Sequence, residues 1–313
     1  MFFLKKKKVS ELMLNWLDKK DNLKIQSYQR YENLIKGIIV PYIGDELSKD
    51  ITEERIKYFF QELNENDIAL STQKTILYII KSSWYYGLEN GYCNYINFKN
   101  IKIKATQQNI HVLSKNEQSI LEEELLHKIN IRKLCIMLCL YTGLRIGEVC
   151  GLKWEDINFE QKSLVIRRTI QRIKNNNSNI KNKTLLIESS PKSETSNRVV
   201  PVPDFIISLL KLFKSKDNFY IISKSINLYD PRQLELCFER ILKSCNLKYI
   251  KFHTLRHTFA TRSIESKMDV KTLSEILGHS SVEITLKLYV HPSYDMKKTS
   301  IENLVLFMNK KIS

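Results

Sequence analysis

The 313-residue sequence lacks any apolar run long enough to cross a bilayer, since its longest run extends only from Leu134 to Tyr141. Its start, MFFLKKKK, places the charges after a very short apolar stretch, which is not the order of a secretory signal. None of the six cysteines forms a C-x-x-C pair, and Cys135 and Cys139 lie inside the apolar run, as reduced core thiols do. We therefore expect a cytoplasmic protein without membrane contact or a zinc cluster.

Acidic residues are the scarcer charged group, and 34 Asp and Glu against 50 Lys and Arg give a formal net charge of +16. This excess favours a polyanionic partner, because each phosphate contact releases counterions. A solvated, lysine-rich surface explains the same excess equally well, so charge alone does not decide between the two. With 43% hydrophobic and 27% charged residues, the chain is expected to be globular and has the length of two domains.

The first part of the chain has a helical pattern. Val9, Leu12, Met13, Trp16 and Leu17 follow the spacing of one buried helix face. Three more helices are expected: one over residues 25–39 that stops at Pro41, one capped by Thr52 and one capped by Ser71. These patterns predict an all-α domain over residues 1–100, followed by a basic linker over residues 101–112.

The second domain, expected over residues 113–313, mixes helices with a few strands. Ser114 and Glu117 form a capping box that opens a helix. Further helices are expected over 131–141, 145–152, 204–214, 231–245, 254–267, 270–277 and 281–290, with a tail helix after them. Segments rich in Val, Ile and Thr predict three strands: Ser163–Ile173, Lys183–Ser189 and Asn197–Val202. The fold class is thus mainly α with a small antiparallel β-sheet.

Cationic and phenolic residues recur in short motifs of this domain. These are TGLRIGE at 142–148, Lys192 in the turn 191–196, HTLRHTFAT at 253–261, LGHSS at 277–281 and LYVH at 288–291. Such a set indicates a site that grips a phosphate with cations and attacks it with a phenol. In this order the motifs resemble those of the tyrosine recombinases, or phage-integrase family, over residues 113–291 and more loosely in the helical domain before them.

The resemblance implies an N-terminal SAM-like domain that binds core DNA sites and a mixed α/β catalytic domain. It also implies double-stranded DNA as partner, a homotetramer on two DNA sites, and neither metal nor other cofactor. Two guanidiniums would supply the charge stabilisation that metal ions give elsewhere. A directionality factor would be a further partner of such an enzyme.

The resemblance also implies a role for each candidate residue. Tyr289 would attack the scissile phosphate and leave a 3′-phosphotyrosyl bond, while Arg145 and Arg256 bind the non-bridging oxygens. The other three act on protons and hydrogen bonds: Lys192 as general acid for the leaving 5′-oxygen, His253 in proton transfer at the tyrosine, and His279 as a donor to the phosphate. We assign no role to His257 or His291, and expect Glu148 to support the Arg145 helix by a local hydrogen bond.

Rival functions remain open at this point. His253 and His257 have the i, i+4 spacing of a zinc hydrolase, but Thr254 stands where that motif needs glutamate. A type IB topoisomerase would share the phosphotyrosine step, and a decayed recombinase would only occupy DNA sites. LGHSS and the tail favour a recombinase over the topoisomerase, and the complete set of candidate residues favours an active enzyme.

Two departures bear on the kind of recombinase. The helical pattern starts near Val9, so we expect no arm-binding domain and the two-domain layout of the Xer dimer resolvases. The long segment from Arg167 to Thr184, however, resembles integrases of low-GC bacterial phages and mobile elements. We favour integration or excision of a mobile element, with an Xer-like dimer resolvase as the alternative. In the tail, Ile301, Leu304, Val305 and Met308 form one apolar stripe.

Overall fold

The computed structural model of the protein describes residues 5–21, 23–103, 111–175, 183–190, 197–289 and 294–309. The chain forms two compact units, Met1–Gln108 and Asn109–Ser313. No helix within these described ranges is long and apolar enough to cross a membrane. The predicted linker lies partly outside the described residues. Lys192 and the turn around it lie wholly outside them.

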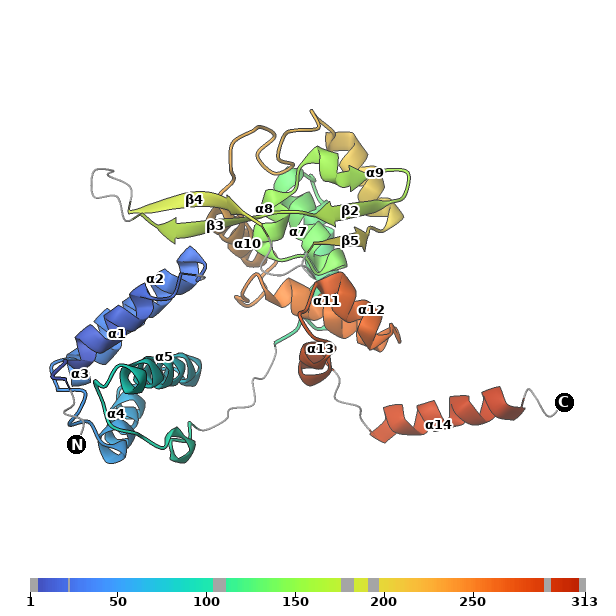
Figure 1. Ribbon diagram of the computed structural model, residues 1–313. Coiled ribbons are helices and arrows are strands. Elements are labelled where there is room, and N and C mark those ends of the chain that lie inside the picture. Colours follow the sequence, from blue (N-terminus) through green and yellow to red (C-terminus); the bar gives the residue numbers. More distant parts are fainter. Residues whose placement is uncertain are drawn as a thin grey trace. The chain divides into compact units, whose positions relative to one another are not determined.

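The first unit consists of helices (Figure 1). They are α1 (Val9–Asp18), α2 (Ile25–Leu34), the π-helical turn η1 (Ile35–Ile39), α3 (Val40–Ile43), α4 (Glu53–Glu65), α5 (Leu70–Glu89) and the 3₁₀ turn η2 (Phe98–Asn100). The apolar face predicted for α1 is confirmed, because all five of its residues are buried and the helix packs against α5. The core of this unit is separate from that of the second.

Two helix ends in this unit differ from prediction. The helix expected to stop at Pro41 passes instead through η1 and continues as α3 to Ile43. Pro41 lies in the first turn of α3, where proline is tolerated because the missing N–H needs no helical partner. The cap predicted at Ser71 is also wrong, since Ala69 takes the cap position. The Thr52 cap is confirmed: its hydroxyl accepts the Arg55 N–H.

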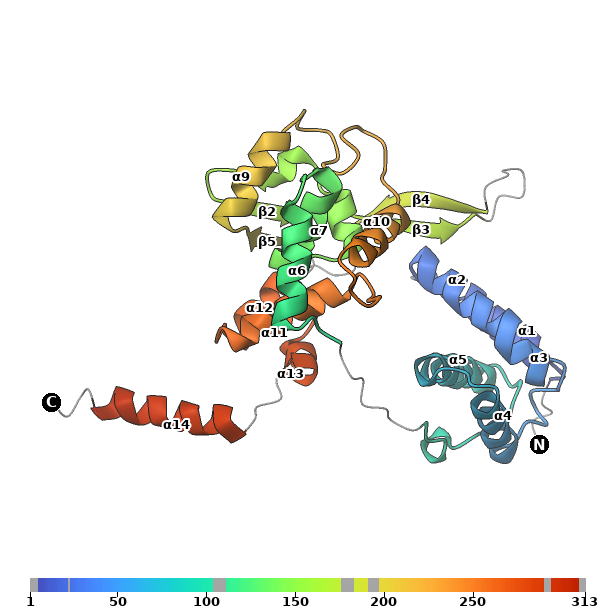
Figure 2. The ribbon, with the colours of Figure 1, turned by 180° about the vertical axis from the view of Figure 1, so that it is seen from behind.

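The second unit is also mainly helical. Its helices are α6 (Lys115–Leu126), α7 (Ile131–Thr142), α8 (Ile146–Gly151), η3 (Trp154–Asp156), α9 (Asp204–Phe213), α10 (Pro231–Ser244), α11 (Thr254–Glu265), α12 (Val270–Leu277), α13 (Val282–Tyr289) and α14 (Tyr294–Asn309). The Ser114–Glu117 capping box is confirmed at the start of α6. Helix α7 is buried along most of its length and contacts α6, α8, α9, α10 and α11; Figure 2 shows it from behind.

Within the described residues, the strands of this unit form two small antiparallel sheets. One contains β1 (Ile157–Asn158), β2 (Ser163–Ile166) and β5 (Arg198–Pro201) in the order β1-β2-β5. The other is the hairpin of β3 (Thr169–Lys174) and β4 (Thr184–Ser189), which projects from the unit in Figure 1. The predicted fold class is confirmed.

The single strand predicted over 163–173 is nevertheless wrong, because the chain leaves the first sheet after Ile166 and enters the second at Thr169. The break falls at Arg168, whose guanidinium turns inward and donates to the buried carboxylate of Asp156 at 2.6 Å. Strand β2 pairs with β5 and strand β3 pairs with β4, so the partner strand changes at this break.

Helices α11, α12 and α13 contact one another and lie together at one side of the unit (Figure 1). They share a small core of their own that contains Ala260, Leu273, Leu277 and Tyr289. Because α11 also packs against α7, this core lies beside the C-terminal end of α7 and the start of α8. The segments that carry the predicted motifs are thereby brought together.

Candidate active site

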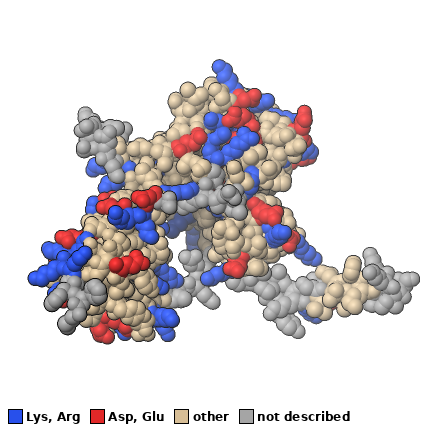
Figure 3. All heavy atoms as spheres, viewed as in Figure 1, with Lys and Arg blue, Asp and Glu red and all other residues tan. Residues whose placement is uncertain are grey.

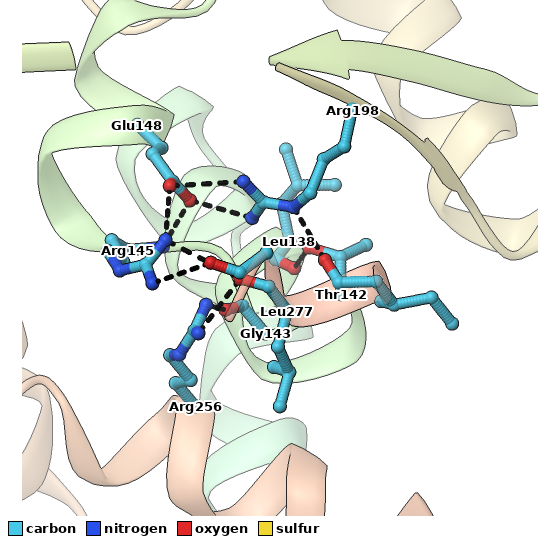
Figure 4. Close-up of polar contacts among 10 residues, drawn as sticks. Leu138, Thr142, Gly143, Arg145, Glu148, Arg198, Arg256 and Leu277 are labelled. Atoms are coloured by element: carbon cyan, nitrogen blue, oxygen red, sulfur yellow. Dashed lines mark hydrogen bonds and ion pairs between the residues drawn. The ribbon is translucent and has the colours of Figure 1, made fainter. Parts of the chain in front are cut away.

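Two arginines from distant parts of the sequence meet at one backbone oxygen. Arg145 occupies the N-cap position of α8, and Arg256 lies in the first turn of α11. The carbonyl oxygen of Leu277 accepts from Arg145 Nη1 at 3.4 Å and from Arg256 Nη2 at 2.9 Å (Figure 4). Arg256 also donates to the Gly143 carbonyl at 2.8 Å, and Arg145 to the Gly278 carbonyl at 3.2 Å. The end of α12 therefore holds both guanidiniums.

The carbonyls of Gly143 and Gly278 can point toward the two arginines because the backbone of both glycines adopts the left-handed conformation. Gly143 ends α7 with φ +67°, and Gly278 ends α12 with φ +63°. Glycine reaches this region without the steric penalty of a Cβ atom. Gly143 is in addition tightly packed, since a Cβ there would lie 2.6 Å from side-chain atoms of Leu277 and Phe259.

A buried carboxylate fixes the first arginine from the other side. Glu148 is only 4% exposed and accepts from Arg145 Nη1 at 2.7 Å and from the Arg145 backbone N–H at 3.0 Å. The local hydrogen bond expected for this glutamate is thus confirmed. Glu148 is also paired with Arg198 of β5, with a Nη2–Oε2 distance of 2.9 Å. Burial alone would raise the pKa of the Glu148 carboxyl, but the hydrogen bond and charge of Arg198, helped by Arg145, lower it to about 2.

The candidate nucleophile lies at the end of α13 and contacts a histidine. Tyr289 is 9% exposed, and its hydroxyl oxygen lies 2.6 Å from Nδ1 of His257. Burial raises the pKa of the Tyr289 phenol, while the charges of Arg256 and Arg145 oppose this rise. Both arginines therefore act electrostatically on the phenol from within the same site.

The two histidines predicted for the site, His253 and His279, lie near Arg145 and Arg256. His253 forms the N-cap of α11, and its ring meets that of His257 edge to face with centroids 4.6 Å apart. His279 follows α12, and its Nδ1 lies 2.8 Å from the Thr285 hydroxyl. Burial, followed by the neighbouring positive or imidazole groups, lowers the pKa of His253 and of His279 to about 4. Both are therefore neutral at neutral pH.

Positive charge is concentrated around the buried arginine. Arg256 is 2% exposed, and burial together with the charge of Arg145 lowers the pKa of its guanidinium to about 9. It stays protonated at neutral pH, but at an electrostatic cost. An anion placed between Arg145 and Arg256 would relieve that cost. The arrangement is thus suited to bind a phosphate beside a phenol.

Five of the six predicted site residues come together in this region: Arg145, His253, Arg256, His279 and Tyr289. The sixth, Lys192, lies outside the described residues. Sequence reasoning gave no site role to Arg198 or His257. The repeated histidine at positions 253 and 257 was a visible signal for His257, because residues four apart lie on one helix face. Nothing in the motifs pointed to Arg198.

Comparisons with known proteins bear on both units. The profile of the phage integrase family matches residues 111–296, and that of the phage integrase N-terminal SAM-like domain matches residues 8–64. A protein of Caldanaerobacter subterraneus subsp. tengcongensis named tyrosine recombinase XerC-like is 30% identical, over 95% of this chain and 82% of the relative.

Two solved structures share the fold. The Tn1549 transposon integrase in complex with transposon right end DNA superposes with a TM-score of 0.78 at 19% identity, covering 96% of this chain and all of that one. A lambda integrase tetramer bound to a Holliday junction gives a TM-score of 0.67 at 16% identity, covering 93% of this chain and 80% of that one.

Proposed function

The chain belongs to the phage integrase family of tyrosine recombinases, and we propose that it cuts and rejoins DNA through a phosphotyrosyl bond at Tyr289. One observation supports Tyr289 as the nucleophile. Arg145 and Arg256 both donate to the Leu277 carbonyl, and both are close enough to the Tyr289 phenol for their charges to affect its pKa. A nucleophile and two phosphate-binding groups thus lie in one place.

In the proposed reaction, the Tyr289 oxygen attacks the scissile phosphorus and the bond from phosphorus to the 5′-oxygen breaks. The 3′ end becomes attached to the enzyme, and a second strand reverses the step. Arg256 uses two of the five N–H donors of a guanidinium on the Gly143 and Leu277 carbonyls, which fixes its plane. Its other donors, and those of Arg145, bind the phosphate oxygens, whose negative charge grows in the transition state.

Three more residues complete the proposed machinery. Lys192 gives its proton to the departing 5′-oxygen. His279 is neutral, is hydrogen-bonded to Thr285, and donates to a phosphate oxygen. His253, which is neutral and lies at the start of α11, assists proton transfer at the tyrosine. All three assignments rest on the motif positions in the family.

The proposed substrate is double-stranded DNA, held by the SAM-like helical unit of residues 1–100 and the catalytic unit of residues 113–313, joined by the linker 101–112. Lys and Arg occur on both units on the face seen in Figure 3, mixed with Asp and Glu. The net charge of +16 supports binding through phosphates. The Tn1549 integrase structure is a complex with transposon right end DNA, and the lambda integrase structure is a tetramer bound to a Holliday junction. We propose the same partner and a homotetramer on two sites, with a directionality factor for one direction of reaction.

Integration or excision of a mobile element is the biological role we favour, because the chain carries the long hairpin segment between Arg167 and Thr184. The 30% identity to a relative named XerC-like supports the second candidate, resolution of chromosome or plasmid dimers. The two roles differ in their DNA sites. Recombination between two different sites supports integration, whereas reaction only between two copies of one site supports dimer resolution.

The phosphotyrosyl step is tested with a nicked suicide substrate that carries the recombination site. Wild-type protein should accumulate a covalent protein–DNA adduct, and Tyr289→Phe should accumulate none while binding DNA with unchanged affinity, because the cationic contacts remain. Tyr249→Phe, which changes an exposed tyrosine, is the matched control and should react like wild type. Peptide mapping of the adduct to Tyr294, or to any residue other than Tyr289, would contradict the assignment.

A further inference from the structure

We infer that His257 is a catalytic residue that takes the proton from the Tyr289 hydroxyl as the phenol attacks. The inference rests on the proposed function and adds a residue outside the predicted machinery. His257 Nδ1 and Tyr289 Oη lie 2.6 Å apart, within the range of a short hydrogen bond between side chains. In the described site, no other side-chain hydrogen bond to this hydroxyl oxygen is found.

The charges around the pair favour two neutral partners in this hydrogen bond. The neighbouring titratable and charged groups are Arg256 and His253 on the α11 side and Arg145 at the start of α8. Burial, followed by the charge of Arg256, lowers the pKa of His257, which favours the neutral form of its ring. A neutral imidazole has one donor and one acceptor nitrogen. A phenol with a raised pKa keeps its hydrogen. If the hydroxyl donates that hydrogen to Nδ1, the imidazole must carry its own hydrogen on Nε2, and we infer this tautomer.

This arrangement satisfies the geometric requirement for a general base. The base must lie within hydrogen-bond reach of the proton that it removes. As the bond from Oη to phosphorus forms, the O–H bond of Tyr289 breaks and its proton passes to His257 Nδ1, which becomes an imidazolium. The bond to the 5′-oxygen breaks on the other side of the phosphorus, where Lys192 supplies a proton. The proton count balances without any further reactant.

His253 does not have this position in the structure. Its ring meets the edge or face of His257 with centroids 4.6 Å apart, and His257 in turn meets Tyr289 with centroids 5.7 Å apart. His257 therefore lies between His253 and the phenol in this chain of contacts. His253 can orient the His257 ring, whereas His257 touches the reacting oxygen.

The test compares His257→Asn with wild type in single-turnover cleavage of the suicide substrate. The Asn amide keeps a hydrogen-bonding atom near the position of Nδ1 but cannot accept a proton at neutral pH. General base catalysis is typically worth about 10²–10⁴-fold, and we expect a loss of that size in the cleavage rate with unchanged DNA affinity. His127→Asn, which changes an exposed histidine, should cleave like wild type.

A 5′-bridging phosphorothioate separates this role from leaving-group protonation, because its sulfur leaves without a proton. Lys192→Ala should recover on that substrate, whereas His257→Asn should not. On the same substrate the rate of His257→Asn should rise in proportion to hydroxide concentration above neutral pH, while the wild-type rate stays flat. The inference would be overturned if His257→Asn cleaved at the wild-type rate. It would also be overturned if the variant cleaved slowly but its rate, like that of wild type, did not change with pH.

A measurement on the wild-type protein does not depend on how the variant folds. Nitrogen-15 shifts of labelled histidine, assigned in the wild-type protein through linked backbone nuclei, report which ring nitrogen carries the hydrogen. We expect Nε2–H and an unprotonated Nδ1 at neutral pH, and hydrogen on Nδ1 would overturn the inference. If wild type forms no adduct at Tyr289 at all, the proposed function fails first, and the two failures are thus distinguishable.

Discussion

At the scale of single residues, the site depends on a carboxylate that never meets the substrate in our proposal. Glu148 is buried between Arg145 and Arg198 and bonds to both. Its charge offsets two guanidiniums that would otherwise repel each other in a poorly solvated place. Removing one partner of a buried ion pair leaves the others uncompensated, which typically costs about 3–5 kcal/mol.

We expect Glu148→Gln to destabilise the second unit by about 3–5 kcal/mol at neutral pH. Hydrogen exchange of peptides from α7 and α8 in increasing urea would measure the change in that unit. Cleavage should fall as well, because Arg145 loses the carboxylate that fixes its side chain. The matched control is Glu123→Gln on the exposed face of α6, which should stay within about 0.5 kcal/mol of wild type.

The cost of Glu148→Gln should also depend on pH in a defined direction. The pKa of Glu148 is lowered to about 2 in the folded protein, against about 4.3 for an unperturbed glutamate. A lowered carboxyl pKa contributes stability that is complete above the unfolded value and is lost as pH falls toward the folded value. The difference between wild type and Glu148→Gln should therefore shrink below about pH 4. A difference that grows on acidification would contradict the ion-pair explanation.

Residue types in motifs were enough to single out residues that the fold brings together in the candidate site, but not the contacts among them. Arg145, Arg256 and Tyr289 stand in patterns that a core does not require, so the sequence alone singles them out. The partner of the phenol was missed because spacing shows that His253 and His257 share a helix face, but not which ring faces α13. Arg198 was missed because its strand reads as an ordinary Val-rich segment, and its pairing with Glu148 is a contact across 50 positions.

At the scale of elements, the site is built where helices end. The C-terminus of α7 presents the Gly143 carbonyl to Arg256, and the C-terminus of α12 presents the Leu277 carbonyl to both arginines. Carbonyls in the last turn of a helix lack helical partners and carry the negative end of the helix dipole. They therefore suit cationic side chains that must be held without being neutralised.

We expect Gly143→Ala to impair both folding and cleavage. The left-handed conformation alone costs a residue with a Cβ about 1–2 kcal/mol. The new Cβ would also lie 2.6 Å from Leu277 and Phe259, which would shift the ends of α7 and α12 and the carbonyls that hold Arg256. Single-turnover cleavage and hydrogen exchange of α7 peptides would measure the two effects.

Gly91→Ala is the matched control, because Gly91 has φ +70° but a Cβ there would meet nothing within 4 Å. It carries the conformational cost without the steric clash and lies in the first unit, where η2 and α5 peptides report its effect. Gly143→Ala should therefore cost more than Gly91→Ala, and it alone should slow cleavage. Equal costs with normal cleavage would show that the close packing at Gly143 is not needed for the site.

Most elements could be predicted because each is decided locally. The Ser114–Glu117 box and Gly143 mark the start of α6 and the end of α7 by hydrogen bonding and backbone freedom alone. The exceptions were decided by distant contacts. Nothing local shows that the chain changes its partner strand between Ile166 and Thr169. Pro41 was expected to end a helix. A π-helical turn before it shifts the hydrogen-bond register, so Pro41 lies instead in the first turn of the next helix, α3.

At the scale of the whole molecule, the last helix leaves apolar side chains in solvent. Ile301 is 62% exposed, Leu304 51%, Val305 48% and Met308 56%, so the stripe predicted from the sequence is uncovered in the single chain. Leu306 and Phe307 are exposed as well. An isolated amphipathic helix of this length is marginal in water and is stabilised by packing its apolar face. A second copy of the chain would provide that packing in a tetramer.

We therefore expect the tail to couple assembly to cleavage by docking on a neighbouring protomer. Truncation after Ser293 should leave binding to a single DNA site intact and abolish the paired-site complex on native gels. Leu304→Ser with Val305→Ser should act in the same way while keeping the helix, and Lys298→Ser, at an exposed charged position, should pair sites normally. Circular dichroism would verify that each variant is folded. If the folded truncation pairs sites as well as wild type, or if it loses single-site binding too, the tail packs on its own protomer or has no role in assembly.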